Sequence, residues 1–147
     1  MTFKFAQGKF EMKNPSKYAG IKTPLARSSW EFVFMKMLDE HPGVESWASE
    51  SIKIPYRDPL TGKATVYVPD FFIVYLDKNK NKHAEVVEVK PANQTILEKV
   101  GKNAFHQAQY IKNMAKWEAA NAWCKQQGIK FRVINEDDIF HQGGKRR

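Results

Sequence analysis

Cysteine is almost absent from this 147-residue sequence, in which Cys124 is the single example. One thiol cannot form an intrachain disulfide, so the fold has to be held by its apolar core. A chain of this kind fits a reducing compartment. Cys124 falls within a stretch of helical periodicity, where a small buried side chain is a better interpretation than a catalytic nucleophile.

The sequence also lacks the signatures of several common chemistries. Its four histidines are scattered, and no His/Cys spacing is typical of a zinc site. There is no glycine-rich phosphate loop and no Gly-x-Ser-x-Gly nucleophile turn. No apolar run approaches the length of a membrane span, and residues 1–5 show no apolar region of a signal peptide. We therefore expect a soluble intracellular protein that uses none of these chemistries and contacts no membrane.

Positive charge, by contrast, is in excess. The sequence holds 24 Lys and Arg against 16 Asp and Glu, for a formal net charge of +8, while 42% of its residues are hydrophobic. The apolar content and length predict one globular domain over residues 1–147. The charge favours a polyanionic partner, with DNA or RNA first. Residues 1–24 are interpreted as a basic arm, or a loosely packed terminus, and residues 141–147 as a flexible basic tail.

A β-hairpin is predicted at the centre of the chain. Two runs rich in β-branched and aromatic residues, 69–75 and 85–90, flank a stretch of turn-forming residues. If the turn is centred on Asn79, Asp70 lies directly opposite Glu88. Facing side chains on paired strands have Cβ atoms about 5 Å apart. The hairpin is therefore expected to bring two carboxylates together.

Two carboxylates this close repel each other unless a cation lies between them. Mg²⁺ binds carboxylate oxygens at about 2.0–2.1 Å and answers that need. Side chains alternate along a strand, so Lys90 is expected on the same face as Glu88. Asp, Glu and Lys around a metal-bound water are the groups needed for metal-assisted phosphodiester hydrolysis. The alternative is an edge hairpin that carries charges only for solubility.

A helix is predicted before the hairpin, beginning at Ser28. Ser28 and Glu31 have the spacing of a capping box, and His41-Pro42-Gly43 ends the helix. Two interpretations of Glu31 stay open, a helix cap or a third acid that approaches the metal. Arg27 is either a phosphate contact or an ordinary surface arginine.

The remaining elements are strands and one long helix. Strands are expected near residues 10–12 and over 51–56, 63–68 and 129–134. The long helix is predicted over 103–127, with Gly128 at its C-terminal cap and a short final helix starting at 135–138. Its expected apolar side includes Ala104, Ala108, Ile111, Met114, Ala122 and Trp123. Its lysines either face DNA or are simply solvated.

The order of these elements and the motif Pro69-Asp70 … Glu88-Val89-Lys90 resemble the PD-(D/E)xK, restriction-endonuclease-like superfamily. More closely, the chain resembles the head completion nucleases of large tailed bacteriophages, and it is also similar to transposon-end-cleaving endonucleases. The residues that carry the resemblance are 14–18, 27–31, 47–50, 54–56, 69–71, 88–91 and 115–117. The fold implied is α/β: a restriction-endonuclease-like mixed β-sheet flanked by helices. Its parts are an N-terminal helix, a central β-hairpin that carries the site, a long C-terminal helix and a last strand.

The resemblance implies a deoxyribonuclease that uses Mg²⁺, or Mn²⁺ in its place, on double-stranded DNA. It further implies head completion and head–tail joining on packaged DNA, with phage head or neck proteins as partners. The location implied is the cytoplasm of the infected bacterial host, or the virion. Two alternatives stay open: a non-catalytic DNA-binding component of the head–tail junction, and a dimeric Holliday-junction resolvase on the same fold.

Together, the motif and the resemblance predict a set of site residues. The predicted catalytic residues are Glu31, Asp70, Glu88 and Lys90. The predicted metal ligands are Asp70, Glu88 and the backbone carbonyl of Val89, with Glu31 binding directly or through water. The predicted DNA contacts are Arg27, Lys102, Lys112 and Lys116, with Gln94 as an accessory polar group.

Overall fold

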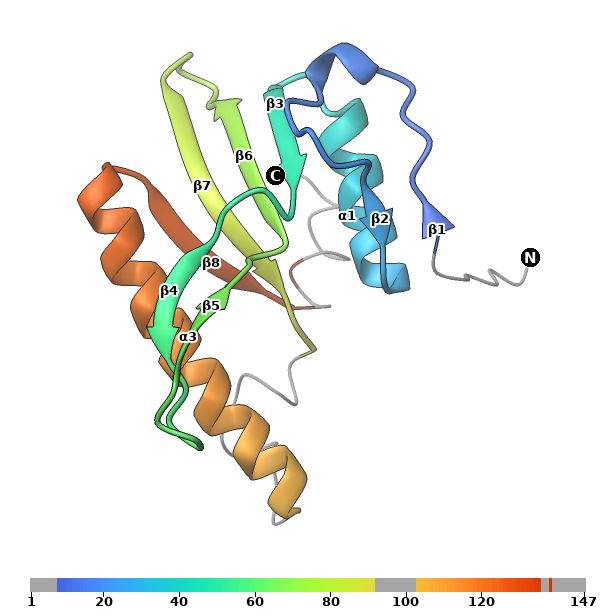
Figure 1. Cartoon of the computed structure of the whole chain (residues 1–147). Helices are drawn as coiled ribbons and strands as arrows, with labels where there is room; N and C mark the ends of the chain where they lie inside the picture. The colour runs from blue at the N-terminus through green and yellow to red at the C-terminus, as the bar shows by residue number, and fades with distance from the viewer. Residues whose placement is uncertain (1–7, 92–102, 136–137, 139–147) are drawn as a thin grey trace.

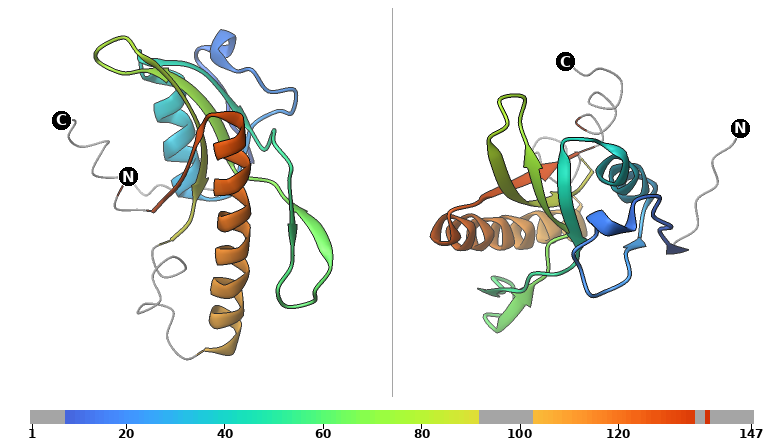
Figure 2. Two further views of the ribbon diagram at one scale, coloured as in Figure 1. Left: turned by 90° about the vertical axis from the view of Figure 1, so that its left-hand side faces the viewer. Right: turned by 90° about the horizontal axis from the view of Figure 1, so that it is seen from above.

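The computed structural model describes residues 8–91, 103–135 and 138. Its centre is a four-stranded mixed sheet with one helix on each face (Figures 1 and 2). The strands, in spatial order, are β3 (Val44–Ser49), β6 (Phe71–Leu76), β7 (Lys82–Val89) and β8 (Lys130–Ile134). Only the β7–β8 pair is parallel, and the other neighbours are antiparallel. The predicted fold class, a restriction-endonuclease-like mixed α/β sheet, is confirmed.

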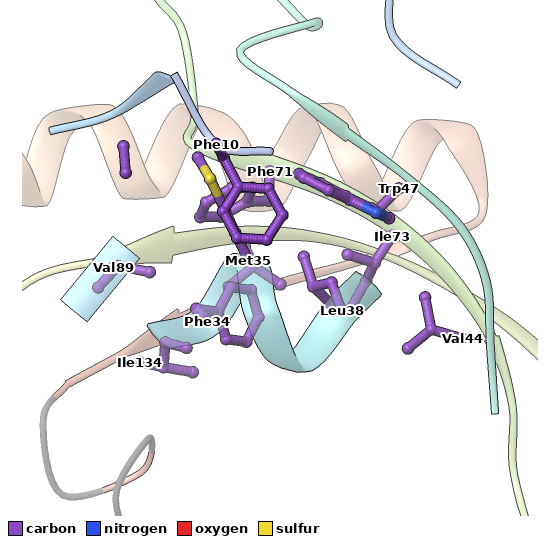
Figure 3. Packing of buried hydrophobic residues seen from close by; sticks show 12 residues of the cluster. Phe10, Phe34, Met35, Leu38, Val44, Trp47, Phe71, Ile73, Val89 and Ile134 are labelled. Atoms are coloured by element: carbon purple, nitrogen blue, oxygen red, sulfur yellow. The ribbon is translucent and has the colours of Figure 1, made fainter. Parts of the chain in front are cut away.

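Helix α1 (Ser29–Glu40) covers one face of this sheet. Ser28 caps it as predicted, its Oγ accepting a hydrogen bond from the Glu31 N–H at 3.1 Å. The helix buries Phe34, Met35 and Leu38 against the sheet (Figure 3). Trp47 of β3, with none of its surface exposed, packs into the same cluster. This cluster is the main core, and it fixes α1 beside the ends of the central strands.

Helix α3 (Ala104–Gln127) lies on the opposite face. Its predicted C-terminal cap is confirmed, because Gly128 ends the helix with φ +75°, and the Asn103 side chain caps its start by accepting from the His106 N–H. Its predicted apolar side is wrong in part: Met114 and Trp123 pack inward, whereas Ala104, Ile111 and Ala122 are exposed. The buried residues are Asn113, Trp117, Ala120 and Cys124. The large Trp117 ring decides which side faces inward, and the many alanines of the helix give only a weak periodic signal.

Strands β4 (Ile54–Arg57) and β5 (Ala64–Tyr67) form a separate two-stranded sheet. This small sheet lies beside α3 (Figure 1) and forms a second core with it, in which Ile54 and Tyr67 contact Trp117 and Ala120. Strand β5 falls within its predicted range and β4 ends one residue beyond its own, whereas their separation from the main sheet was not predicted. The second core holds the middle of α3 over the end of the central hairpin.

The described part of the N-terminal segment, residues 8–24, is packed on the domain rather than extended as an arm. Strand β1 (Gly8–Lys9) pairs with β2 (Leu25–Ala26), so the strand expected at residues 10–12 lies earlier in the chain. A short 3₁₀ helix, η1 (Pro15–Lys17), lies between them. Phe10 is buried in the main core. The apolar side chains of this segment therefore outweigh its basic composition.

Asp39, at the end of α1, anchors this segment. Its carboxylate is buried and accepts hydrogen bonds from the backbone N–H groups of Lys13 and Asn14, at 2.8 and 3.0 Å. The Asn14 side chain and the Lys17 ammonium donate to the Asp39 carbonyl. One buried acid thus satisfies two backbone donors that would otherwise lack a partner.

The hairpin of β6 and β7 has the predicted register. Phe71 pairs with Val87, so Asp70 lies opposite Glu88. The turn is closed by a hydrogen bond from the Asp77 N–H to the Asn81 carbonyl.

The chain after β8 is described only in part. The backbone N–H groups of Asn135 and Asp138 donate to each other's side chains, as expected at a helix start. The rest of the predicted final helix and the predicted tail at 141–147 lie outside the described residues. No helix in the described part of the chain has the length and apolar content needed to cross a bilayer.

Replacing Asp39 with alanine is expected to release the N-terminal segment. Two backbone N–H groups lose their buried acceptor, at about 1–3 kcal/mol each. Unfolding in urea should show the loss of stability, and limited trypsin digestion should cut faster after Lys13 and Lys17. Glu45→Ala, which removes an exposed acid of β3 paired with Lys82, is the matched control and should change neither measurement appreciably. Equal digestion of the two variants would show that Asp39 is not the anchor.

Candidate active site

Asp70 and Glu88 meet where β6 begins and β7 ends. The Asp70 N–H donates to Glu88 Oε1 at 3.1 Å, and the Val89 N–H donates to Asp70 Oδ2 at 2.8 Å. Each acid is therefore held by the backbone next to the other acid. These bonds use one oxygen of each carboxylate, which leaves the second oxygen of each for a cation.

Burial makes this pair electrostatically unfavourable in its charged form. Glu88 is only 5% exposed. Burial raises the pKa of Asp70 well above its ordinary value, and the charges of Glu88 and Glu31 raise it further. Burial also raises the pKa of Glu88, although Lys90 opposes that change. The site thus concentrates negative charge that the nearby protein groups do not fully neutralise.

Lys90 supplies a cation beside the pair. Its Nζ lies 3.6 Å from Glu88 Oε2, and its side chain is 28% exposed. The Lys90 side chain therefore contacts the Glu88 carboxylate and is also partly accessible to solvent. The predicted convergence of Asp70, Glu88 and Lys90 is observed in the structure.

Glu31 lies at the start of α1 and near the acids of the site, while its part in binding a metal stays a prediction. It is the third residue of α1, and its Oε1 accepts a hydrogen bond from the Arg27 N–H at 3.1 Å. Burial raises its pKa, and the charges of Glu88 and Glu50 add to that effect. Glu31 therefore stabilises the start of α1, and its carboxyl group is also repelled by the nearby charges of Glu88 and Glu50. Within the described residues no three His, Cys, Asp or Glu side chains lie close enough to hold a metal ion directly.

Arg27 lies on the α1 side of the site, bound to a residue that the sequence analysis missed. Its Nε and Nη2 donate to Glu50 Oε2 and Oε1, at 2.8 and 3.2 Å, and Lys22 Nζ donates to Glu50 Oε1 at 2.6 Å. These contacts lower the pKa of Glu50 to about 2, with Arg27 as the largest favourable cause. No local pattern signals this ion pair, because its partners are far apart in the sequence.

A second missed residue, Tyr67, lies on the α3 side. Its hydroxyl is buried beside the Glu88 carboxyl, without reaching ordinary hydrogen-bond geometry to any described residue. Burial raises the pKa of Tyr67, and the Glu88 charge raises it further. Lys116 Nζ lies 5.5 Å from the centroid of the Tyr67 ring. A tyrosine ending a short strand resembles any core aromatic, so the sequence held no signal for it.

Lys116 is half-buried, and its surroundings differ from those of a solvated surface lysine. Burial lowers its pKa, the neighbouring Lys90 lowers it further, and Glu88 opposes the change. Lys112, one turn earlier, pairs with Asp58 at 3.5 Å. The structure therefore places one of the predicted DNA contacts, Lys116, near Glu88 and Lys90, and the other, Lys112, beside Asp58. The predicted residues Lys102 and Gln94 lie outside the described residues.

Comparisons with known proteins show the family to which this chain belongs. The family described as TnsA-like endonuclease N terminal matches residues 41–136, a range that contains Asp70, Glu88, Lys90 and Lys116. The head completion nuclease of Enterobacteria phage T4 is 33% identical over 148 residues, covering 94% of this chain and 96% of the relative. The resemblance drawn from the sequence motifs is confirmed.

Replacing Asp70 with asparagine is expected to stabilise the protein without divalent cations. Because the pKa of Asp70 is raised by folding, ionisation costs stability as pH rises from the ordinary pKa of an aspartate through the raised value. Asparagine keeps an acceptor for the Val89 N–H but carries no charge. The Tm of Asp70→Asn should exceed that of the wild type by a few degrees at about pH 7.5, and the gain should vanish towards about pH 3.

Asp77→Asn, in the turn of the same hairpin, is the matched control. His83 lowers the pKa of Asp77, so this variant should lose stability, rather than gain it, near neutral pH. A lower Tm for Asp70→Asn near neutral pH, or a gain that persists in acid, would contradict the electrostatic account of the site.

Proposed function

Because the chain belongs to the TnsA-like endonuclease family, we propose that it is a Mg²⁺-dependent deoxyribonuclease of the PD-(D/E)xK type. The observation that carries the proposal is the buried pair Asp70 and Glu88, held together by backbone hydrogen bonds with Lys90 beside it. A protein keeps two repelling carboxylates in this position at a cost in stability. Such a cost is typical of residues retained for function.

The donor set of the site fits a hard divalent cation. One oxygen from each of Asp70 and Glu88 is not used by the backbone bonds between them, and carboxylate oxygens are preferred ligands of Mg²⁺ and Mn²⁺. The Val89 carbonyl is the third ligand in the proposal. Glu31 would bind through water, since no third acid lies close enough for direct binding in the described residues. When bound, the cation supplies Lewis-acid stabilisation of the phosphate and a more acidic water.

Lys90 has two tasks in this proposal. Its ammonium, held 3.6 Å from Glu88 Oε2, orients the attacking water and adds positive charge beside the scissile phosphate. Asp70 and Glu88 would bind the cation without rearranging, because backbone N–H groups of the hairpin already hold both side chains. Glu31 contributes negative charge from α1 and helps to retain the cation.

The DNA backbone would contact cations on both sides of the carboxylates. Arg27 lies on the α1 side and Lys112 and Lys116 lie on α3, while Lys102 is proposed from the sequence alone. These cations would bind the phosphate backbone and would not distinguish one base from another. Binding to double-stranded DNA should therefore depend strongly on salt, because phosphate contacts release counterions.

The biological setting is proposed from the relative in phage T4, which is named a head completion nuclease. By analogy, this chain would act on packaged DNA during head completion and head–tail joining. Phage head or neck proteins would be its partners. It would work in the cytoplasm of the infected host or in the virion.

The direct test is cleavage of supercoiled plasmid DNA. Wild-type protein should nick or linearise the plasmid with Mg²⁺ or Mn²⁺ and leave it intact with EDTA. Lys90→Ala should lose at least about 10²-fold in rate, because a charge that stabilises the transition state is removed. Lys82→Ala, at the other end of β7 in an exposed pair with Glu45, is the matched control and should cleave normally.

The outcomes separate the two alternatives. No cleavage, with salt-sensitive DNA binding retained in all three proteins, would favour a non-catalytic DNA-binding component. Preference for four-way junctions over linear duplex, by a stable dimer, would favour a junction resolvase on the same fold. Cleavage that survives in EDTA would contradict the metal-dependent proposal itself.

Lys116→Ala is expected to weaken DNA binding uniformly across sequences. Loss of one phosphate contact should reduce the slope of log affinity against log salt concentration by about one. Fluorescence anisotropy with a short duplex at several salt concentrations measures that slope. Lys125→Ala, in the last turn of the same helix, removes an equal charge away from the site. An equal change in slope for both variants would show that Lys116 has no special contact.

A further inference from the structure

Glu50 has a backbone conformation that glutamate rarely adopts. Its φ is +51°, in the left-handed region, where a Cβ atom clashes with the backbone and glycine or asparagine is usual. The residue follows β3 directly, and its N–H donates to the Asp70 carbonyl at 2.9 Å. The strained residue is therefore attached to the backbone of the catalytic aspartate. Strain of this kind persists only where the surrounding contacts hold the residue in place, and it is concentrated at functional sites.

The Glu50 side chain binds two cations that precede α1 in the chain, Lys22 and Arg27. Both of its oxygens accept from the Arg27 guanidinium, and Oε1 also accepts from Lys22. Its side chain is only 14% exposed, whereas those of Lys22 and Arg27 are 56% and 46% exposed. The carboxylate is thus covered, while the cations that it holds remain accessible to a ligand. A two-point contact also fixes the plane of the guanidinium, which a single contact leaves free to rotate.

Arg27 lies within reach of the electrostatic effect of the metal-site acids. The charges of Glu31 and Asp70 act on Arg27, after the stronger effect of Glu50. Without Glu50, the nearest carboxylates for Arg27 would be those acids, and pairing there would compete with a divalent cation. Glu50 therefore keeps positive charge close to the site and away from its ligands.

We propose that Glu50 is a positioning residue that holds Arg27 and Lys22 as a binding pair for a backbone phosphate of the DNA substrate. This inference rests on the proposed function, and it names the group that the α1 side of the site binds. Lys90 and Lys116 serve the opposite side, so the scissile phosphate lies between two sets of cations. The Glu50 carboxylate itself touches neither the phosphate nor the metal.

Long-range electrostatics and positioning predict opposite results for Glu50→Gln. Removing an acid makes the protein more positive, so electrostatic attraction alone predicts tighter DNA binding and no loss in cleavage rate. Positioning predicts a kcat that falls at least tenfold, with overall duplex affinity retained or increased. Glu45→Gln is the matched control, since it makes the same change of charge on β3, the strand that Glu50 follows, and breaks an exposed pair with Lys82. Its kcat should stay within twofold of the wild type.

A double-mutant cycle with Arg27 separates positioning from a general loss of structure. If Glu50 acts through Arg27, Glu50→Gln should change kcat by less than threefold in an Arg27→Ala background. Losses that simply multiply would overturn the proposal. Calorimetric titration of Mn²⁺ into the DNA-free protein supplies a readout without cleavage, and Glu50→Gln should bind Mn²⁺ more weakly because Arg27 is free to approach the acids.

Glu50→Asn guards against a variant that merely misfolds. Asparagine tolerates the left-handed conformation and lacks the negative charge, so its Tm should be near that of the wild type while kcat falls. A normal kcat in Glu50→Asn would overturn the proposal.

A wild type that cleaves no DNA would contradict the proposed function, and the phosphate pair is then tested by binding. In Lys90→Ala protein, the NMR signal of Arg27 Nε–H should shift when a short duplex is added, and Glu50→Gln should abolish that shift. An unchanged signal in the parent protein would overturn the inference independently of cleavage.

Discussion

One unfavourable interaction, the repulsion between Asp70 and Glu88, is the constraint that the rest of the structure has to accommodate. The hairpin of β6 and β7 sets their register, and two backbone N–H groups bind their side chains, so neither acid can turn away from the other. The packed core behind β6 and β7 contributes the stability that offsets this repulsion. In the proposed function, the same rigidity would preorganise the site, because a cation would meet ligands already in place.

Charge around this pair is arranged in layers. The acids Glu31 and Asp70, whose pKa values are raised, lie in the middle of the site. Cations lie on two sides of them: Lys116 on α3, and Arg27 with Lys22 before α1. Each helix therefore has a part in the chemistry besides covering the sheet. The first turn of α1 places Glu31, and the second core presses α3 close enough for Lys116 to lie over Tyr67. Glu50 completes the arrangement by keeping Arg27 near the acids without letting it neutralise them.

The features that could be predicted from the sequence are those that neighbouring residues decide. The hairpin register follows from turn residues between two apolar runs, and the caps at Ser28 and Gly128 follow from local hydrogen bonding. Features decided by distant residues could not be predicted. No residue near Glu50 in the sequence indicates that Arg27 is its partner. The buried side of α3 is set by the contact of Trp117 with the β4–β5 sheet, whose residues are distant in the sequence. The packing of residues 8–24 was missed because Phe10 and the Asp39 anchor outweigh a basic composition.

The parallel pairing of β7 with β8 has a consequence for the order of assembly. Residues of β6 and β7 are close in the chain, whereas Glu85 meets Lys130 only after the whole segment between them has been placed. Loop closure over that distance costs more entropy than closing the hairpin turn, so these contacts are expected late in folding. During synthesis the acids of the hairpin emerge before α3 and Lys116. The chain therefore completes its electrostatic surroundings only once its last strand has joined the sheet, which delays a competent site until the domain is whole.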